Sequence, residues 1–136
     1  NYFVDSACWI ALLNRQDSLH KQANAVYQGL MKEGSQFITS SSVIEETANA
    51  LSSPLFRPSI IAFYHQILAS SRVTIISVDS ELWDKGWSLF EKRGDKGWSL
   101  TDCISLSIME EREIESALTS DRHFIQAGYK ACLILS

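Results

Sequence analysis

Short apolar runs alternate with helical segments along almost the whole chain, and this alternation limits the folds that the sequence can adopt. Continuous apolar runs of about four to eight residues are typical of buried strands, whereas apolar spacings of three and four are typical of helices. We predict strands at 2–5, 36–39, 73–77, 117–120 and 131–135, and helices at 6–13, 18–33, 41–51, 59–70, 79–93 and 101–111, with a turn or short helix before the last strand. Strands separated by helices pair in parallel, with helices on both faces. The sequence therefore predicts the α/β class, as a three-layer α/β/α fold with a central parallel sheet.

The length and composition indicate one domain. The chain has 136 residues, of which 46% are hydrophobic and 21% charged, so we assign residues 1–136 to a single globular domain. Gly34 follows a predicted helix, where a glycine often ends it, and Pro58 lies where another helix would begin. No apolar run reaches the roughly 20 residues of a membrane span, and the first residues show no secretory signal.

The cysteines and the net charge narrow the classes of protein further. Cys8, Cys103 and Cys132 lie in apolar surroundings, without CxxC spacing or clustered histidines. This pattern indicates free thiols in a reducing compartment and speaks against a zinc site, so we expect a cytoplasmic protein. The net charge of −4 is unfavourable for a broad contact with nucleic acid. Any such contact is expected to be local or assisted by a metal ion.

Two of the predicted strands end in an acid. Asp5 follows the first strand, and Asp121 follows the strand at 117–120. Ligands of open parallel sheets bind beyond the carboxyl ends of the strands, and acids that meet there need a cation between them. The alternative is a capping role for both residues, because Asp commonly begins helices and turns. The sequence leaves both roles open.

A third acid, Asp102, lies in the first turn of the helix at 101–111. Ser99 and Asp102 have the spacing of a capping box, in which each side chain bonds the backbone N–H of the other residue. An acid in this position can take such hydrogen bonds and still direct an oxygen at a metal ion. The two roles are compatible.

The helix at 41–51 contains two adjacent acids, Glu45 and Glu46. Ser42 and Glu45 again have capping-box spacing, which gives Glu45 a structural explanation. Glu46 has no such local explanation and borders the apolar stripe of the helix. A solvated surface position is the alternative for Glu46, so the periodicity favours it only slightly as a site residue.

Read together, these segments resemble the PIN domain, the fold of VapC-type toxins and related ribonucleases. The resemblance covers nearly the whole chain and depends on four short motifs in the family's order. They are a hydrophobic strand ending in Asp5-Ser6, a Val-x-x-Glu helix with Val43 and Glu46, a Ser-x-x-Asp helix start at Asp102, and a Thr-x-Asp strand end with Thr119 and Asp121, followed by Phe124 and Gly128. The resemblance selects Glu46 over Glu45. The catalytic and metal-binding acids that it implies are Asp5, Glu46, Asp102 and Asp121.

The resemblance also implies a function. We expect a metal-dependent ribonuclease that hydrolyses RNA phosphodiester bonds and is the toxin of a toxin–antitoxin pair. The expected partner is a protein antitoxin, and the expected oligomeric state is a homodimer. Carboxylate clusters suit Mg²⁺ or Mn²⁺, which would activate a water molecule and stabilise the leaving oxygen. The site would then belong to a hydrolase whose acids serve the cation.

Several residues near the acids are candidates for contact with RNA. The basic candidates are Lys92, Arg93, Lys96, Arg122 and His123, although a solvated charged surface is the alternative for the first two. Trp87 and Trp98 are candidates for stacking on unpaired bases, whereas the apolar surroundings of Trp9 predict a core position.

Two alternatives come from other functional classes. A phospho-acceptor signalling domain of the receiver type also has acids at strand ends, and Asp79 after the third strand would be its acceptor. Asp5 lacks the acidic neighbour that such domains have, and no Lys follows Ile134. A noncatalytic interaction module of the same fold is the second alternative, which the sequence does not exclude.

Overall fold

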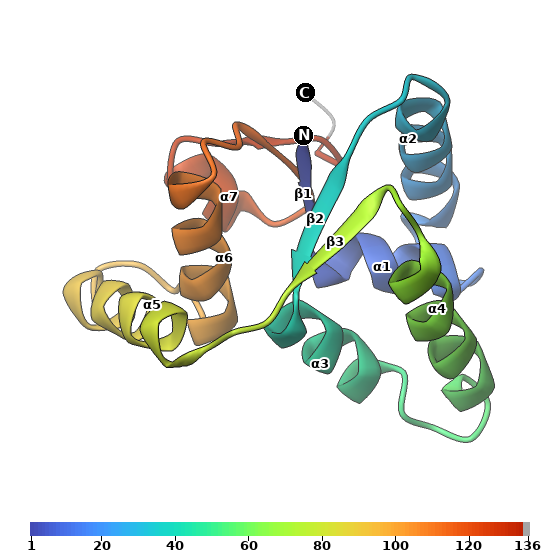
Figure 1. The fold of residues 1–136 in the computed structure, drawn as a ribbon, viewed down its shortest axis with the longest axis horizontal. Coiled ribbons are helices and arrows are strands. Elements are labelled where there is room, and N and C mark those ends of the chain that lie inside the picture. Colours follow the sequence, from blue (N-terminus) through green and yellow to red (C-terminus); the bar gives the residue numbers. More distant parts are fainter. Residues whose placement is uncertain (135–136) are drawn as a thin grey trace.

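The computed structural model describes residues 1–134, and within them five parallel strands form one sheet. The strands are β1 (Tyr2–Val4), β2 (Phe37–Ser40), β3 (Val73–Ile76), β4 (Ser116–Leu118) and β5 (Lys130–Ala131), in the spatial order β3-β2-β1-β4-β5. The helices are α1 (Ser6–Leu13), α2 (His20–Lys32), α3 (Ser41–Ala50), α4 (Arg57–Ala69), α5 (Ser80–Lys92), α6 (Leu100–Glu111) and α7 (Arg122–Gln126). Figure 1 shows α1, α2 and α4 on one side of the sheet and α5, α6 and α7 on the other. The predicted three-layer α/β/α fold with a parallel sheet is confirmed.

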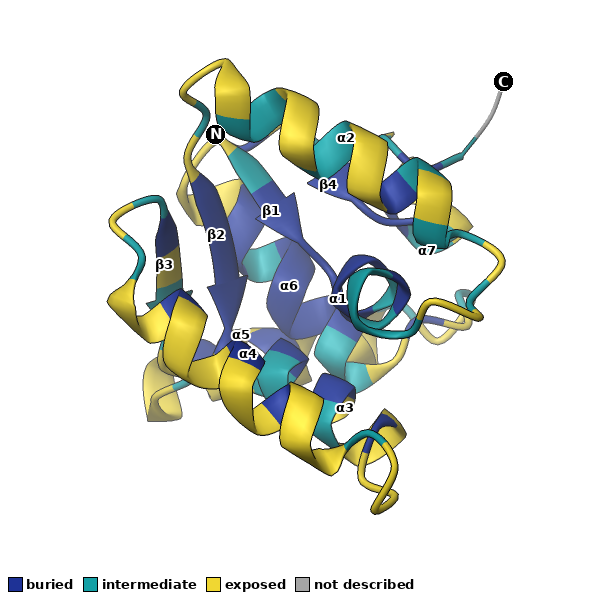
Figure 2. Ribbon diagram, turned by 90° about the vertical axis from the view of Figure 1, so that its right-hand side faces the viewer, coloured by how far each residue is buried: buried dark blue, intermediate teal, exposed yellow. Residues whose placement is uncertain are grey.

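The central strand β1 is buried because it has a neighbouring strand on each side and helices on each face. Phe3 lies opposite Ile38 of β2 and Ala117 of β4, and all three residues are buried. Figure 2 shows the same burial along β1, β2 and α6. A parallel strand covered on both faces needs apolar residues in succession, which explains why these strands read as continuous apolar runs.

The order of the strands contradicts the signalling alternative. Receiver-like domains have the order 2-1-3-4-5, whereas this sheet has the order 3-2-1-4-5. Asp79, the acceptor candidate under that alternative, is the N-cap of α5, and its Oδ1 accepts a hydrogen bond from Leu82 N at 2.8 Å. Among residues 1–134, no helix has the length and apolar character needed to cross a membrane.

The predicted boundaries agree with the structure to within two residues, except at the last strand. Gly34 has a φ of +84° directly after α2 ends, and Pro58 lies in the first turn of α4, so both predictions of helix ends are confirmed. The prediction of a strand at 131–135 was wrong: β5 ends at Ala131, 132–134 do not continue it, and residue 135 lies outside the described residues. The strand is short because the chain turns directly after Ala131, where Ile134 N donates a hydrogen bond to Ala131 O at 3.3 Å.

The predicted capping box of α3 was also wrong. The N-cap is Ser40, whose Oγ accepts a hydrogen bond from Val43 N at 3.2 Å, and Ser42 is already inside the helix. Ser40 is also the last paired residue of β2, opposite Ile76 of β3. Because strand pairing keeps Ser40 extended, α3 begins at the next residue.

A close approach of α5 to α6 depends on Gly86. A Cβ at this position would lie 3.2 Å from Ile104 Cα and closer still to Ile104 Cγ1. We predict that Gly86→Ala lowers the free energy of unfolding by about 1–2 kcal/mol, because overpacking outweighs the ~1 kcal/mol gained in helix propensity. Urea denaturation would measure this loss.

The matched control is Gly29→Ala in α2, where an added Cβ would meet no heavy atom within 4 Å. This variant should be neutral or stabilised by up to about 1 kcal/mol. Equal stabilisation of both variants would show that α5 can move away from α6 at no cost.

Candidate metal centre

The four predicted acids lie on four elements that meet at the carboxyl edge of the sheet. Asp5 directly follows β1, and Asp121 follows the end of β4. Since Val4 of β1 pairs with Leu118 of β4, the chain leaves both strands at the same place. Asp102 lies in the first turn of α6, and Glu46 lies in α3, which packs against α1 and α6.

Asp5 is a buried carboxyl group, only 5% exposed. Its pKa is raised from 3.8 to about 7, mainly because burial disfavours the ionised form. Hydrogen bonds from the Thr119 side chain and the Ser6 backbone lower this pKa, while the charges of Asp102 and Glu46 raise it. Although Asp5 precedes α1, its side chain makes no capping hydrogen bond, so the capping alternative was wrong for this residue.

Asp102 caps α6 with one oxygen. Its Oδ2 accepts a hydrogen bond from Ser99 N at 3.0 Å, and Ser99 Oγ accepts one from Asp102 N at 3.0 Å, so the predicted capping box is confirmed. The same Oδ2 lies 2.8 Å from Nδ1 of His123. Oδ1 accepts no hydrogen bond from residues 1–134. The cap therefore leaves one oxygen of this acid free.

Asp121 is linked to Asp5 through one hydroxyl group. Asp121 N donates to Thr119 Oγ1 at 3.0 Å, and Thr119 Oγ1 donates to Asp5 Oδ2 at 2.8 Å. Asp121 also caps α7, since its Oδ1 accepts a hydrogen bond from His123 N at 2.9 Å. The same oxygen lies 3.1 Å from His123 Nδ1. The capping alternative therefore holds for Asp121, and it again engages only one oxygen.

Glu46 and Glu45 point to different parts of the surface. Glu46 Oε1 accepts a hydrogen bond from Ser6 Oγ, at the first residue of α1. Glu45 lines a groove between α3 and α4, together with Ile60 and Tyr64. Successive residues of a helix are about 100° apart around its axis, so only one of two adjacent acids can face the other carboxylates.

The hydrogen bonding of the acids suits a hard cation. Within residues 1–134, side-chain donors reach one oxygen of each acid: Asp5 Oδ2, Glu46 Oε1, Asp102 Oδ2 and Asp121 Oδ1. The second oxygen of each acid receives no side-chain hydrogen bond in this part of the chain. One anchored and one free oxygen is the arrangement in which a ligating carboxylate is oriented by outer hydrogen bonds. Mg²⁺ and Mn²⁺ prefer such oxygen ligands.

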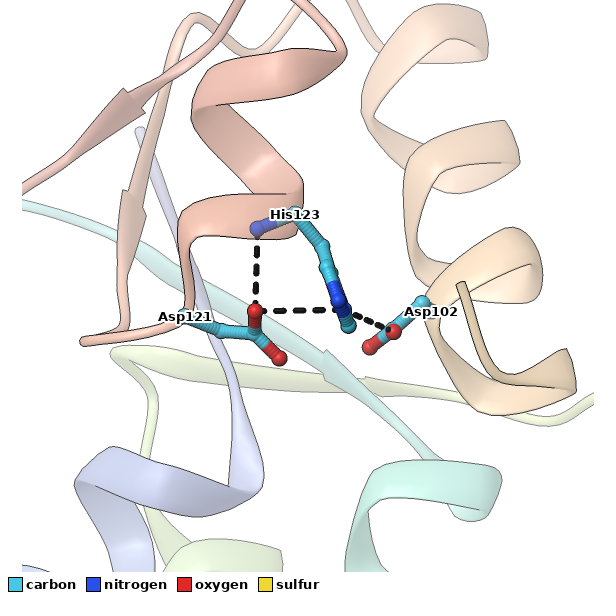
Figure 3. Close-up of side chains that lie close together, drawn as sticks. All are labelled: Asp102, Asp121 and His123. Atoms are coloured by element: carbon cyan, nitrogen blue, oxygen red, sulfur yellow. Dashed lines mark hydrogen bonds and ion pairs between the residues drawn. The ribbon is translucent and has the colours of Figure 1, made fainter. Parts of the chain in front are cut away.

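His123 also belongs to this cluster, although the sequence had indicated only a possible phosphate contact for this residue. The ligand atoms of Asp102, Asp121 and His123 all lie within 4.8 Å of one another (Figure 3). Ser6 and Thr119 were likewise quoted only as motif positions, and the structure shows that they hold Glu46 and Asp5. Their proximity in sequence to Asp5 and Asp121 was the one available signal.

The predictions for the three tryptophans have different outcomes. Trp9 is 1% exposed and lies in the core, as predicted. Trp98 was wrong as a stacking candidate, because it is 6% exposed, donates from Nε1 to Gln126 Oε1 at 3.0 Å and lies under Arg93. Trp87 is 44% exposed on α5, where its ring lies 5.6 Å from that of Phe90 and its Nε1 donates to Glu91 Oε1. Arg93 also pairs with Asp95, so this guanidinium already has partners.

The cysteines are free thiols, as predicted. Cys8 and Cys103 are buried and Cys132 is half-buried. Burial raises the pKa of the Cys8 thiol to about 12, so this group stays protonated near neutral pH.

Comparison with known proteins identifies the family of the chain. The PIN domain family matches residues 2–129. The chain belongs to this family. Two curated proteins are similar to this chain, each 26% identical to it over 127 residues, which cover 93% of this chain and 94% of theirs. Both are the 23S rRNA-specific endonuclease VapC20 of Mycobacterium tuberculosis, from strains CDC 1551 / Oshkosh and H37Rv. The crystal structure of Mycobacterium tuberculosis VapC20, a sarcin-ricin loop cleaving toxin, matches this PIN domain with a TM-score of 0.84 and 25% identity, covering 95% of this chain and 96% of the other.

Proposed function

We propose that this PIN domain is a metal-dependent endoribonuclease and the toxin of a toxin–antitoxin pair. The observation that carries the proposal is the set of four acids from separate elements, each with one oxygen anchored and one without a side-chain partner. The likeness to VapC20 extends over nearly the full length of both chains and supports the same class of reaction. RNA phosphodiester hydrolysis is the chemistry that combines these two observations.

In this proposal Asp5, Glu46, Asp102 and Asp121 are the catalytic acids that would hold Mg²⁺ or Mn²⁺. When bound, the cation supplies Lewis acidity toward water and toward a phosphate oxygen. The hydroxyls of Thr119 and Ser6 orient Asp5 and Glu46, and the capping box orients Asp102. Because Asp5 is buried beside further acids, a cation would also relieve the repulsion among them.

Ribosomal RNA is the substrate to test, because the named relatives are specific for 23S rRNA. Such a substrate places the proposed activity in the cytoplasm. Arg122 is exposed beside Asp121, and Lys96 lies in the loop before α6, so these two side chains are proposed phosphate contacts. Trp87 remains the proposed stacking residue. With a net charge of −4, the contact with RNA would be confined to this region.

A protein antitoxin and a homodimer belong to the same proposal. The groove between α3 and α4 has a volume of about 670 Å³ and an apolar lining that includes Ile44 and Ile60. Ile61, Tyr64 and Leu68 are exposed on α4, and Trp83 on α5. Exposed apolar surface of this kind supports a protein partner. Light scattering on the purified chain, alone and with the candidate antitoxin, would give the stoichiometry of each assembly.

We predict that the purified chain, free of antitoxin, cleaves single-stranded RNA and ribosomal RNA fragments when Mg²⁺ or Mn²⁺ is present. Excess EDTA should reduce the rate by at least about 100-fold, because metal catalysis supplies several kcal/mol of transition-state stabilisation. Gel analysis of end-labelled RNA measures both rates. Cleavage that persists in excess chelator would remove the metal ion from the mechanism.

The adjacent acids of α3 provide a matched control for contaminating nuclease. Glu46→Gln keeps an oxygen that accepts the hydrogen bond from Ser6 Oγ but removes the negative charge, so the rate of RNA cleavage should fall. Glu45→Gln removes the same charge from the neighbouring position in the α3–α4 groove and should leave the rate unchanged. Equal effects of both substitutions would contradict the assignment of Glu46.

A further inference from the structure

His123 occupies the space between two of the proposed metal ligands. Its Nδ1 lies 2.8 Å from Asp102 Oδ2 and 3.1 Å from Asp121 Oδ1. Figure 3 shows the imidazole ring between the two carboxyl groups, one from the start of α6 and the other from the start of α7. No other described side chain contacts both acids through hydrogen bonds or ion pairs.

The contacts define which atom of His123 acts and how. An ionised carboxylate only accepts hydrogen bonds, so Nδ1 must carry the hydrogen: it donates to Asp102 Oδ2, and Asp121 Oδ1 is the next oxygen, 3.1 Å away. Those oxygens also accept backbone hydrogen bonds, Asp102 Oδ2 from Ser99 N at 3.0 Å and Asp121 Oδ1 from His123 N at 2.9 Å. A protonated Nδ1 has no lone pair for a cation. In this arrangement His123 therefore orients carboxylates and does not ligate.

The second ring nitrogen lies away from the acids. Nε2 makes no hydrogen bond with residues 1–134, and a Cβ added at Gly97 would lie 4.0 Å from it. The His123 side chain is about one-third exposed, so Nε2 is the atom that a direct contact with substrate would use. The two nitrogens thus correspond to two separable roles.

We propose that His123 is a positioning residue of the metal site: its Nδ1–H holds one oxygen of Asp102 and one of Asp121, so that the other oxygen of each acid faces the cation. This inference rests on the proposed metal-dependent nuclease function. Without the shared donor, the two like charges would move apart and the pair of free oxygens would lose its geometry.

The test exploits the different reach of the Asn and Gln side chains. In His123→Asn the amide nitrogen takes the place of Nδ1, whereas in His123→Gln it takes the place of Nε2. His123→Ala removes both, and His65→Ala changes an exposed histidine of α4 outside the site as a control. For each variant of the 136-residue chain, the dissociation constant for Mn²⁺ is measured from the electron paramagnetic resonance signal of free Mn²⁺, and kcat and KM for RNA cleavage are measured on the same sample.

We expect His123→Ala and His123→Gln to weaken Mn²⁺ binding by about 10–100-fold, as loss of an outer hydrogen bond to a metal ligand does. His123→Asn should retain most of the affinity for Mn²⁺. His65→Ala should bind Mn²⁺ like the unchanged chain. The loss of cleavage should follow the loss of Mn²⁺ affinity, with kcat recovering at saturating Mn²⁺. Comparison of Asn with Gln keeps the test valid if the Ala variant folds poorly.

Three results would overturn the inference. If all His123 variants bind Mn²⁺ normally and only Gln retains cleavage, His123 contacts substrate through Nε2. If spin-echo spectra of the unchanged chain show a nitrogen directly coordinated to Mn²⁺, His123 is a ligand. If the unchanged chain binds no Mn²⁺, the metal-dependent function fails together with the positioning role.

Discussion

Asp102→Asn is expected to reduce RNA cleavage by at least about 1000-fold, equivalent to about 4 kcal/mol of transition-state stabilisation. The Asn carbonyl oxygen can take the place of Oδ2 and accept from Ser99 N and His123 Nδ1. The amide nitrogen then replaces Oδ1, the oxygen that accepts no hydrogen bond in the described chain. The substitution therefore removes the proposed ligand atom and keeps the cap.

Thermal unfolding of this variant separates the two roles of Asp102. A cation that binds only the folded chain adds about 2.7 kcal/mol at a hundredfold excess over its Kd, so Mn²⁺ should raise the Tm of the unchanged chain. In Asp102→Asn this rise should shrink, while the metal-free Tm stays equal or increases because one of several close charges is gone.

The matched control is Ser99→Ala, which removes the cap and leaves the charge of Asp102. It should cost roughly 1 kcal/mol of stability and keep the response of the Tm to Mn²⁺. The opposite pattern for Asp102→Asn, a large loss of metal-free stability with an unchanged metal response, would show that Asp102 is only a structural cap.

The second large effect concerns the pH dependence of the metal-free protein. Because the pKa of Asp5 is about 7 in the fold and about 4 in the unfolded chain, the folded form keeps a proton that the unfolded chain has already released. The contribution of Asp5 to the free energy of unfolding is fully present below about pH 4 and is lost as the pH rises through 7. The total loss is on the order of 4 kcal/mol. Urea denaturation in EDTA at several pH values should show this decline.

Asp5→Asn should abolish this part of the pH dependence, since the amide cannot ionise and its oxygen can still accept from Thr119 Oγ1. Above pH 7 the variant should be more stable than the unchanged metal-free chain. Asp84→Asn, an exposed acid on α5, is the control and should leave the pH profile as it is. Parallel profiles for all three proteins would show that burial of Asp5 costs the ionised form nothing.

Local pattern was sufficient to predict most of the fold. The period of the apolar residues depends on each segment alone, which is why α1 and α6 were predicted to within one residue. The position of Asp5 and Asp121 at strand ends followed from the same pattern. The end of β5 could not be predicted in this way, because the turn after Ala131 includes hydrogen bonds from Cys132 N to Ala117 O and from Leu133 N to Thr119 O, which form only in the tertiary structure.

The α/β class, the order of the elements and the acids that follow the strands could all be predicted from the amino-acid sequence, because these properties depend on short stretches of chain. The hydrogen bonds that orient those acids, in contrast, depend on how the helices pack in three dimensions. Ser6 reaches Glu46 across 40 residues, Thr119 reaches Asp5 across 114, and His123 joins Asp102 across 21. Such contacts form only after α1, α3, α6 and α7 pack against the sheet, so no local pattern contains them.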